Sequence, residues 1–201
     1  MKTIFVLCAL LTTATFVTAQ ERVSLEDAQK GARLLTQTAG KISDAPLKLE
    51  VDLEKPDGLK ANEVRILVIP DQKLNGETLA KAGKTVTPLG QLWMHAIAPA
   101  KEGKVISNDK LRFVTVTKDD KEFKVLLFFL GLQKSEKGEM ELVIYGKDKE
   151  PFLKLPVEKS ATQQDLPIEL QGRKEGEGAG VLTLNILGKY KVELPVMKPT
   201  E

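Results

Sequence analysis

The chain has 201 residues, in which 30 Lys and Arg stand against 28 Asp and Glu, so its net charge is close to zero. It contains no basic block of the kind that binds a phosphate backbone, and we therefore expect no nucleic-acid partner. One Cys and one His exclude a disulfide scaffold and a zinc site built from the usual nitrogen and sulfur ligands.

Residues 1–19 have the pattern of a signal peptide. Lys2 supplies the positive start, residues 4–11 form a short apolar core, and residues 17–19 place small side chains at a cleavage site. The pattern predicts a mature bacterial protein that begins at Gln20, lacks Cys, and is secreted or periplasmic. The alternative is a leader that stays attached, but its apolar core is too short to span a bilayer. We therefore expect no transmembrane span after cleavage.

Residues 24–40 have the pattern of a capped, amphipathic helix. Ser24 can accept hydrogen bonds from the first turn, Asp27 favours the positive end of the helix dipole, and Gly40 is a typical stop. Apolar side chains recur at helical spacing, at Leu25, Ala28, Ala32 and Leu35. We expect this helix to pack on the domain behind it, and a partner-docking arm is the alternative. Residues 20–43 are thus an N-terminal helix and linker, and residues 44–201 a single β-sandwich domain.

From Pro46 the apolar period changes to strict alternation. Leu and Val alternate with charged residues over 47–54, which predicts a strand with one buried face, and residues 55–58 predict a turn. Asn75 caps a short connecting helix that ends before Gly83. Other strands are predicted at residues 64–69, 88–99, 111–117, 140–145, 152–157 and 168–170.

The longest apolar run after the signal is residues 122–131. Only Lys124 interrupts its hydrophobic side chains, and the Phe, Val and Leu that compose it pack well in a pleated sheet. A helix is the competing interpretation, but the turn at residues 118–121 and Gly131 leave room for a strand only. We expect a strand covered on both faces at the centre of the core.

The sequence also predicts the register in which the last two strands pair. Their apolar rows are Leu182, Leu184 and Ile186 in one strand, and Tyr190, Val192 and Leu194 in the other. Because directly opposed residues share a face, a three-residue loop at 187–189 pairs the two rows, whereas a two-residue loop would set Leu184 against Glu193. Residues 172–180, rich in Gly and charge, are predicted to be a flexible loop.

These patterns together predict a mostly β fold. Lys- and Gly-rich turns separate short strands at regular intervals, which is typical of an antiparallel β-sandwich, immunoglobulin-like or related. An N-terminal amphipathic helix and one short connecting helix complete the predicted architecture.

The candidate ligand-binding residues are Gln91, Trp93 and His95, which strand alternation places on one face. A Trp beside a His would make a binding platform. The competing interpretation is a strand covered on both faces, in which the indole N–H and the imidazole ring make local hydrogen bonds.

No catalytic motif accompanies these residues. The sequence has no nucleophile elbow, no calcium loop and no glycine loop followed by an anion-binding helix. Two carboxylate pairs are candidates for catalysis: Asp119 with Asp120, in a predicted turn, and Glu139 with Glu141, on an exposed strand face. We expect no cofactor, no metal and no enzymatic activity.

The preferred hypothesis is an exported, non-catalytic binding or structural module of the cell envelope or extracellular space, with a protein partner in the envelope. One alternative is a carbohydrate-binding module centred on Trp93. Another is a hydrolase that uses His95 with carboxylates from neighbouring loops.

Overall fold

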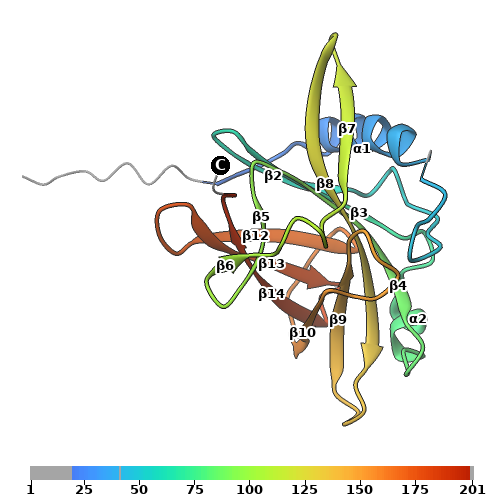
Figure 1. Cartoon of the computed structure of the whole chain (residues 1–201). Coiled ribbons are helices and arrows are strands. Elements are labelled where there is room, and N and C mark those ends of the chain that lie inside the picture. Colours follow the sequence, from blue (N-terminus) through green and yellow to red (C-terminus); the bar gives the residue numbers. More distant parts are fainter. Residues whose placement is uncertain (1–19, 41, 200–201) are drawn as a thin grey trace, which may run out of the picture.

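The computed structural model describes residues 20–40 and 42–199. Figure 1 shows two β-sheets, with a helix beside one of them. The predicted signal peptide, residues 1–19, lies outside the described residues. All strand pairs are antiparallel, so the protein is mostly β with a sandwich-like arrangement, as the sequence predicts at that level.

The first sheet has the strand order β1-β2-β3-β4-β8-β9-β10, and β7 pairs with β8 off this path. Its strands are β1 (Glu21–Arg22), β2 (Asp57–Ala61), β3 (Val64–Pro70), β4 (Thr87–His95), β7 (Phe113–Lys118), β8 (Lys121–Lys134), β9 (Met140–Tyr145) and β10 (Leu153–Pro156).

The second sheet has the order β12-β13-β14-β5-β6, with β11 paired to β14. Its strands are β5 (Ala98–Lys101), β6 (Lys104–Val105), β11 (Glu158–Lys159), β12 (Ile168–Lys174), β13 (Ala179–Ile186) and β14 (Tyr190–Met197). The two helices are α1 (Leu25–Ala39) and α2 (Gly76–Ala80).

The main hydrophobic core fills the space between the sheets. Leu92 and Phe128 of the first sheet and Leu184 of the second are fully buried in it. On the opposite face of β8, Leu127 and Phe129 are buried as well. The prediction of a central strand covered on both faces over 122–131 is therefore confirmed from Leu126 onward, whereas residues 122–124 are exposed, so that part of the prediction was wrong.

The helix α1 covers part of the other face of the first sheet. Ser24 caps it by accepting a hydrogen bond from the backbone N–H of Asp27, and Gly40 follows its last turn. The small side chains of Ala28 and Ala32 let the helix approach the sheet closely. They share a second core with Ala39, Leu67, Ile69, Trp93, Leu127, Phe129, Val143 and Tyr145.

The C-terminal hairpin has the predicted register. Ile186 pairs with Tyr190 and Leu184 with Val192, so residues 187–189 form the three-residue loop. Gly188 has a φ of 65° there, a conformation that Gly adopts without a steric cost. The short helix α2 is also confirmed, and Asn75 caps it.

The segment with the clearest alternation, residues 47–54, is not a strand of either sheet, so this prediction was wrong. Residues 42–56, which we call the strap, cross the α1 side of the first sheet, and one isolated bridge joins Val51 to Asp71. Leu47 and Leu49 are half-buried, as the alternation indicates. However, β3 already pairs with β2 and β4, and so offers the strap no edge.

Three predicted boundaries also differ from the structure. Asp57 and Gly58 begin β2 instead of forming a turn. The loop predicted at residues 172–180 is confined to 175–178, because β12 and β13 extend into both of its ends. The strand predicted over 88–99 breaks at Ala96, where a φ of 58° accompanies the passage from the first sheet to the second.

A buried carboxylate joins the two sheets. Asp57, which is 2% exposed, accepts hydrogen bonds from Arg22 Nε at 2.8 Å and from the Leu170 backbone N–H at 2.7 Å. Arg22 and Asp57 belong to the first sheet and Leu170 to the second. The hydrogen bond to Asp57 raises the pKa of Arg22, so the guanidinium stays charged beside its partner.

Phe128→Ala measures the contribution of the core between the sheets. Removing this fully buried ring should lower the free energy of unfolding by roughly 3 to 5 kcal/mol, measured by denaturant titration. Phe123→Ala is the matched control, because it removes a partly exposed ring from the same strand. It should cost less than about 1 kcal/mol. Equal costs at the two positions would contradict the central place of Phe128.

Asp57→Ala tests the link between the sheets. The substitution leaves the buried Leu170 amide without its acceptor, so the free energy of unfolding should fall by about 2 to 3 kcal/mol. Glu21→Ala, which removes an exposed ion pair with Lys60 on the same two strands, is the control. Its cost should stay under about 1 kcal/mol. A cost for Asp57→Ala no larger than that of the control would show that the sheets do not depend on this contact.

Candidate functional site

An apolar groove of about 450 Å³ lies between α1 and the β7–β8 hairpin, and we call it the helix–hairpin groove. Figure 1 shows the hairpin projecting past the rest of the first sheet, beside α1. Gly31 and Leu35 line the helix side, and Val116 and Phe123 line the hairpin side. The hairpin continues past the other strands because β4 stops pairing with β8 at Leu126 and β9 pairs with β8 only from Phe129 on.

Trp93 lines this groove but shows almost none of its surface. Its side chain is 2% exposed, and its indole Nε1–H donates a hydrogen bond to Gln91 Oε1 at 3.1 Å. An indole held in this way has its polar group already satisfied. Trp93 therefore contributes apolar surface to the groove and has no free hydrogen-bonding group for a ligand.

His95 lies at the end of β4, in the same groove, and is half-buried. Its ring stands edge-on to Phe123, with centroids 6.2 Å apart and planes at 84°. Its Nδ1–H donates to the backbone carbonyl of Lys124 over 3.2 Å. The imidazole therefore contacts the backbone edge of β8.

Within residues 20–40 and 42–199, that edge of β8 has no strand neighbour over residues 121–125. Leu126 pairs with both Met94 of β4 and Phe113 of β7, so these two strands lie on opposite sides of β8. Pairing with β4 stops at Leu126, while pairing with β7 continues to Lys121. Backbone groups on the β4 side of residues 121–125 therefore have no strand partner, and His95 bonds one of them.

One wall of the groove carries an exposed aromatic ring. Among the described residues, the exposed large hydrophobic side chains are Leu25 (48% exposed), Phe113 (51%) and Phe123 (40%). Of these, Phe123 lines the groove. Phe113 pairs with Leu126, a residue of the core between the sheets, and therefore faces away from α1.

Charged side chains of both signs line the rim. Asp27, Glu63, Arg65 and Lys118 all border the groove. Lys198 donates to Glu63 and thereby lowers the pKa of that carboxyl. Arg65 donates to the backbone carbonyls of residues 62 and 64. The rim therefore favours no single sign of charge in a ligand.

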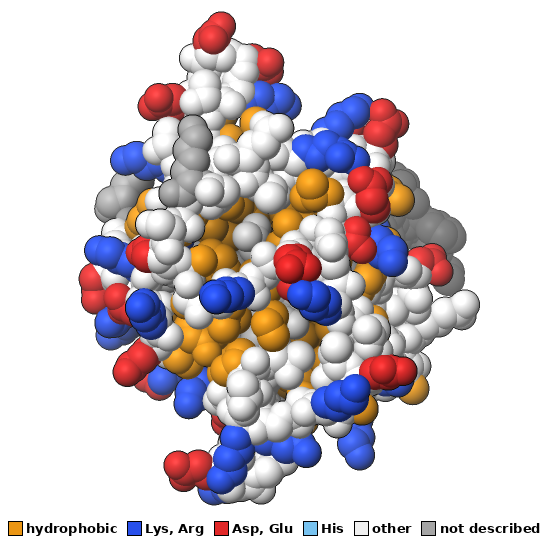
Figure 2. Space-filling model, turned by 90° about the vertical axis from the view of Figure 1, so that its right-hand side faces the viewer, with side chains coloured by type: hydrophobic (Ala, Val, Ile, Leu, Met, Phe, Trp, Pro, Cys, Tyr) orange, Lys and Arg blue, Asp and Glu red, His pale blue; other side chains and the backbone are white. Residues whose placement is uncertain are grey.

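Gln91, the third residue predicted for the site, belongs to a different hollow. It lines a space of about 780 Å³ under the strap, which we call the strap hollow. Seen from the right-hand side of Figure 1, hydrophobic side chains gather on the strap-covered face, with separate charged side chains among them (Figure 2). The structure thus brings Trp93 and His95 into one wall and turns Gln91 to another space, although Gln91 and Trp93 share a hydrogen bond.

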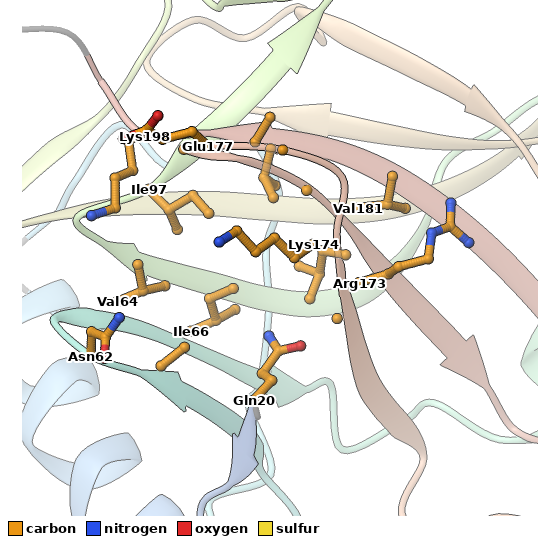
Figure 3. Close-up of a pocket in the computed structure, with 18 residues that line it drawn as sticks. Gln20, Asn62, Val64, Ile66, Ile97, Arg173, Lys174, Glu177, Val181 and Lys198 are labelled. Atoms are coloured by element: carbon orange, nitrogen blue, oxygen red, sulfur yellow. The ribbon is translucent and has the colours of Figure 1, made fainter. Parts of the chain in front are cut away.

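A third hollow, of about 460 Å³, opens between the sheets where the β2–β3 turn faces the β12–β13 hairpin (Figure 3). Two of its three cations have acidic partners: Arg173 pairs with Glu175 at 2.9 Å, and Lys198 pairs with Glu63 at 2.5 Å, while the third is Lys174. Ile66 on its wall belongs to the core between the sheets. This space is the open end of that core, and we assign no site to it.

The predicted carboxylates do not form a cluster with His95. Asp119 and Asp120 form the β7–β8 turn, where both have a positive φ. Among residues 20–40 and 42–199, no three His, Cys, Asp or Glu side chains stand close enough together to hold a metal ion.

The amino-acid sequence does not mark the β7–β8 hairpin as a functional feature. The apolar run from residue 122 predicts burial throughout, and Phe123 was included in it. The one signal to the contrary was Lys124, which follows Phe123 in the exposed part of β8.

In the described part of the chain, neither helix combines the length and the apolar character needed to cross a bilayer. The chain matches no protein-family model, no curated protein and no solved structure.

Proposed function

We propose that the protein is an exported, non-catalytic binding module of the cell envelope or extracellular space, and that it binds an extended segment of a partner protein in the helix–hairpin groove. The partner segment adds as a strand to residues 121–125 of β8, on the side where β4 has ended. The observation that carries this proposal is the coincidence of an unpaired strand edge with an apolar groove.

Strand addition suits this geometry for two reasons. Main-chain hydrogen bonds to the unpaired edge supply affinity, and a groove beside that edge selects the side chains that alternate toward it. Here the groove accepts apolar side chains, since Val116, Phe123 and Val125 line it. Before binding, the backbone carbonyl of Lys124 on this edge accepts a hydrogen bond from His95. The incoming strand then takes the place of His95 at that carbonyl.

The alternatives have less support from the same residues. Sugar-binding platforms present an open aromatic face, whereas Trp93 is buried beneath α1 and bonded to Gln91. A hydrolase would need His95 bonded to a nucleophile or a carboxylate, and the ring bonds a backbone carbonyl instead. Glu63 lines the same groove, but its carboxylate accepts a hydrogen bond from Lys198. An immunoglobulin-like or related sandwich, with an N-terminal amphipathic helix, stays our prediction for the finer classification of the fold.

A displayed library of random dodecamer peptides, selected against residues 20–201, tests the binding proposal. Selected peptides should be extended, with apolar residues at alternate positions, and should protect the backbone amides of residues 121–125 from hydrogen exchange. Gly31→Leu should weaken their binding at least tenfold. A Cβ at Gly31 meets only Leu67 at 3.7 Å, so the larger side chain fits on the helix and fills the groove.

Gln37→Leu is the matched control. It adds the same side chain to an exposed position of α1 outside the groove, and should leave peptide affinity unchanged. The proposal fails if selection enriches no peptide, or if Gly31→Leu binds the selected peptides as tightly as Gln37→Leu does.

Export is tested by expressing the full chain in a bacterium and sequencing the N-terminus of the protein recovered from the periplasm or medium. We expect the sequence to begin at Gln20. Substituting Asp for the small residue Ala19 should block cleavage and retain the uncleaved chain. Recovery of the chain only from the cytoplasm, with its N-terminus intact, would contradict export.

A further inference from the structure

The strap hollow contains a hydrogen-bond donor whose orientation is set by Trp93. An indole N–H can only donate, so the Gln91 amide atom that faces it must be the oxygen. The amide nitrogen Nε2 therefore points away from Trp93. The Gln91 side chain borders the strap hollow, and Nε2 donates no hydrogen bond to any other described residue.

The Gln91 side chain is 7% exposed, and its Nε2 is not among the described atoms that are fully enclosed without a partner, so a ligand in the hollow can reach it. The neighbouring Asp71 is engaged, because it accepts from the backbone amides of Glu50 and Lys73, whose side chains pair at 3.1 Å. The hollow also has polar side chains that are exposed or half-buried, at Ser43, Lys48 and Thr87. Gln91 is therefore its most buried polar group with a donor left for a ligand.

The surroundings of this donor are apolar. Leu47, Leu49 and Val51 of the strap and Phe129 of β8 line the hollow. Its volume, about 780 Å³, falls within the roughly 300 to 1,000 Å³ typical of small-molecule sites. Such sites combine apolar walls with a few placed polar groups, which is the combination found here.

The strap gives the hollow an entrance. It is attached at residue 44, where Arg112 donates to the Asp44 carboxylate at 2.9 Å, and around residues 50–52, where Glu50 N–H donates to Asp71 and Asp52 N–H to the Pro70 carbonyl. Residues 45–49 make no hydrogen bond to another described residue. Residues 45–49 are therefore held to the sheet by the apolar contacts of Leu47 and Leu49 between two anchored ends, and they form the part of the strap that can give way to a ligand.

We propose that the strap hollow binds a small, uncharged, mostly apolar molecule with a carbonyl oxygen, which accepts a hydrogen bond from Gln91 Nε2. The strap covers the apolar body of this ligand. This site is separate from the helix–hairpin groove and does not depend on the function proposed there.

Pairs of small molecules, which we call fragments, test the proposal. Their affinities are measured by titration, and their contacts by NMR of the side-chain N–H groups. Each uncharged ketone is compared with the hydrocarbon of the same shape, phenylacetone with propylbenzene among them. The ketones should bind at least tenfold more tightly than their hydrocarbons and shift the Gln91 Nε2 and Trp93 Nε1 signals. Absence of binding by every ketone, or shifts confined to residues of the helix–hairpin groove, would overturn the proposal.

Two substitutions probe the site independently. Gln91→Glu keeps an oxygen for Trp93 and removes the donor, so it should abolish the preference for ketones. Ala45→Phe leaves Gln91 intact and fills the hollow from the strap, so it should weaken every fragment at least tenfold. A preference that survives Gln91→Glu, or affinity unchanged by Ala45→Phe in a folded protein, would refute the site.

Gly31→Leu distinguishes this proposal from the previous one. It obstructs the helix–hairpin groove and does not border the strap hollow, so fragment binding should be unchanged. Fragment binding lost in Gly31→Leu would place the ligand in the groove and refute the strap-hollow site.

Discussion

The central strands of the first sheet are apolar on both faces, and the rest of the structure depends on covering them. Phe128 and Leu130 of β8 face the second sheet, while Leu127 and Phe129 face α1 and the strap. Apolar surface on both sides of a sheet is stable only when two layers exclude water from it. The second sheet covers one face, and the chain from α1 through the strap covers the other.

The two layers differ in how completely each covers its face of the first sheet. The second sheet is joined to the first through Asp57, which accepts hydrogen bonds from Arg22 of one sheet and from the Leu170 amide of the other. On the opposite face, the cover consists of one helix of 15 residues and a strap without a strand partner. Both hollows to which we assign ligands lie on this incompletely covered face, where apolar surface remains accessible.

The three residues predicted for the site show why side-chain chemistry needs tertiary context. Strand alternation correctly places Gln91, Trp93 and His95 on one side of β4. Their different surroundings come from elements distant in sequence: α1 buries Trp93, the β7–β8 hairpin brings Phe123 to His95, and the strap turns the space beside Gln91 into a hollow. Alternation reports the face of a strand, but it does not report what packs on that face.

The sequence by itself determined the local features of this protein. Capping residues marked both helices, matched apolar rows set the register of the last hairpin, and a long apolar run identified β8, because each signal depends on neighbours within one or two elements. Only the tertiary structure decided that residues 47–54 stay outside the sheets, since β3 was already paired on both sides. It also decided that the β4 side of residues 121–125 is left unpaired, because β4 stops pairing at Leu126, and the length of β4 is set by packing between distant segments.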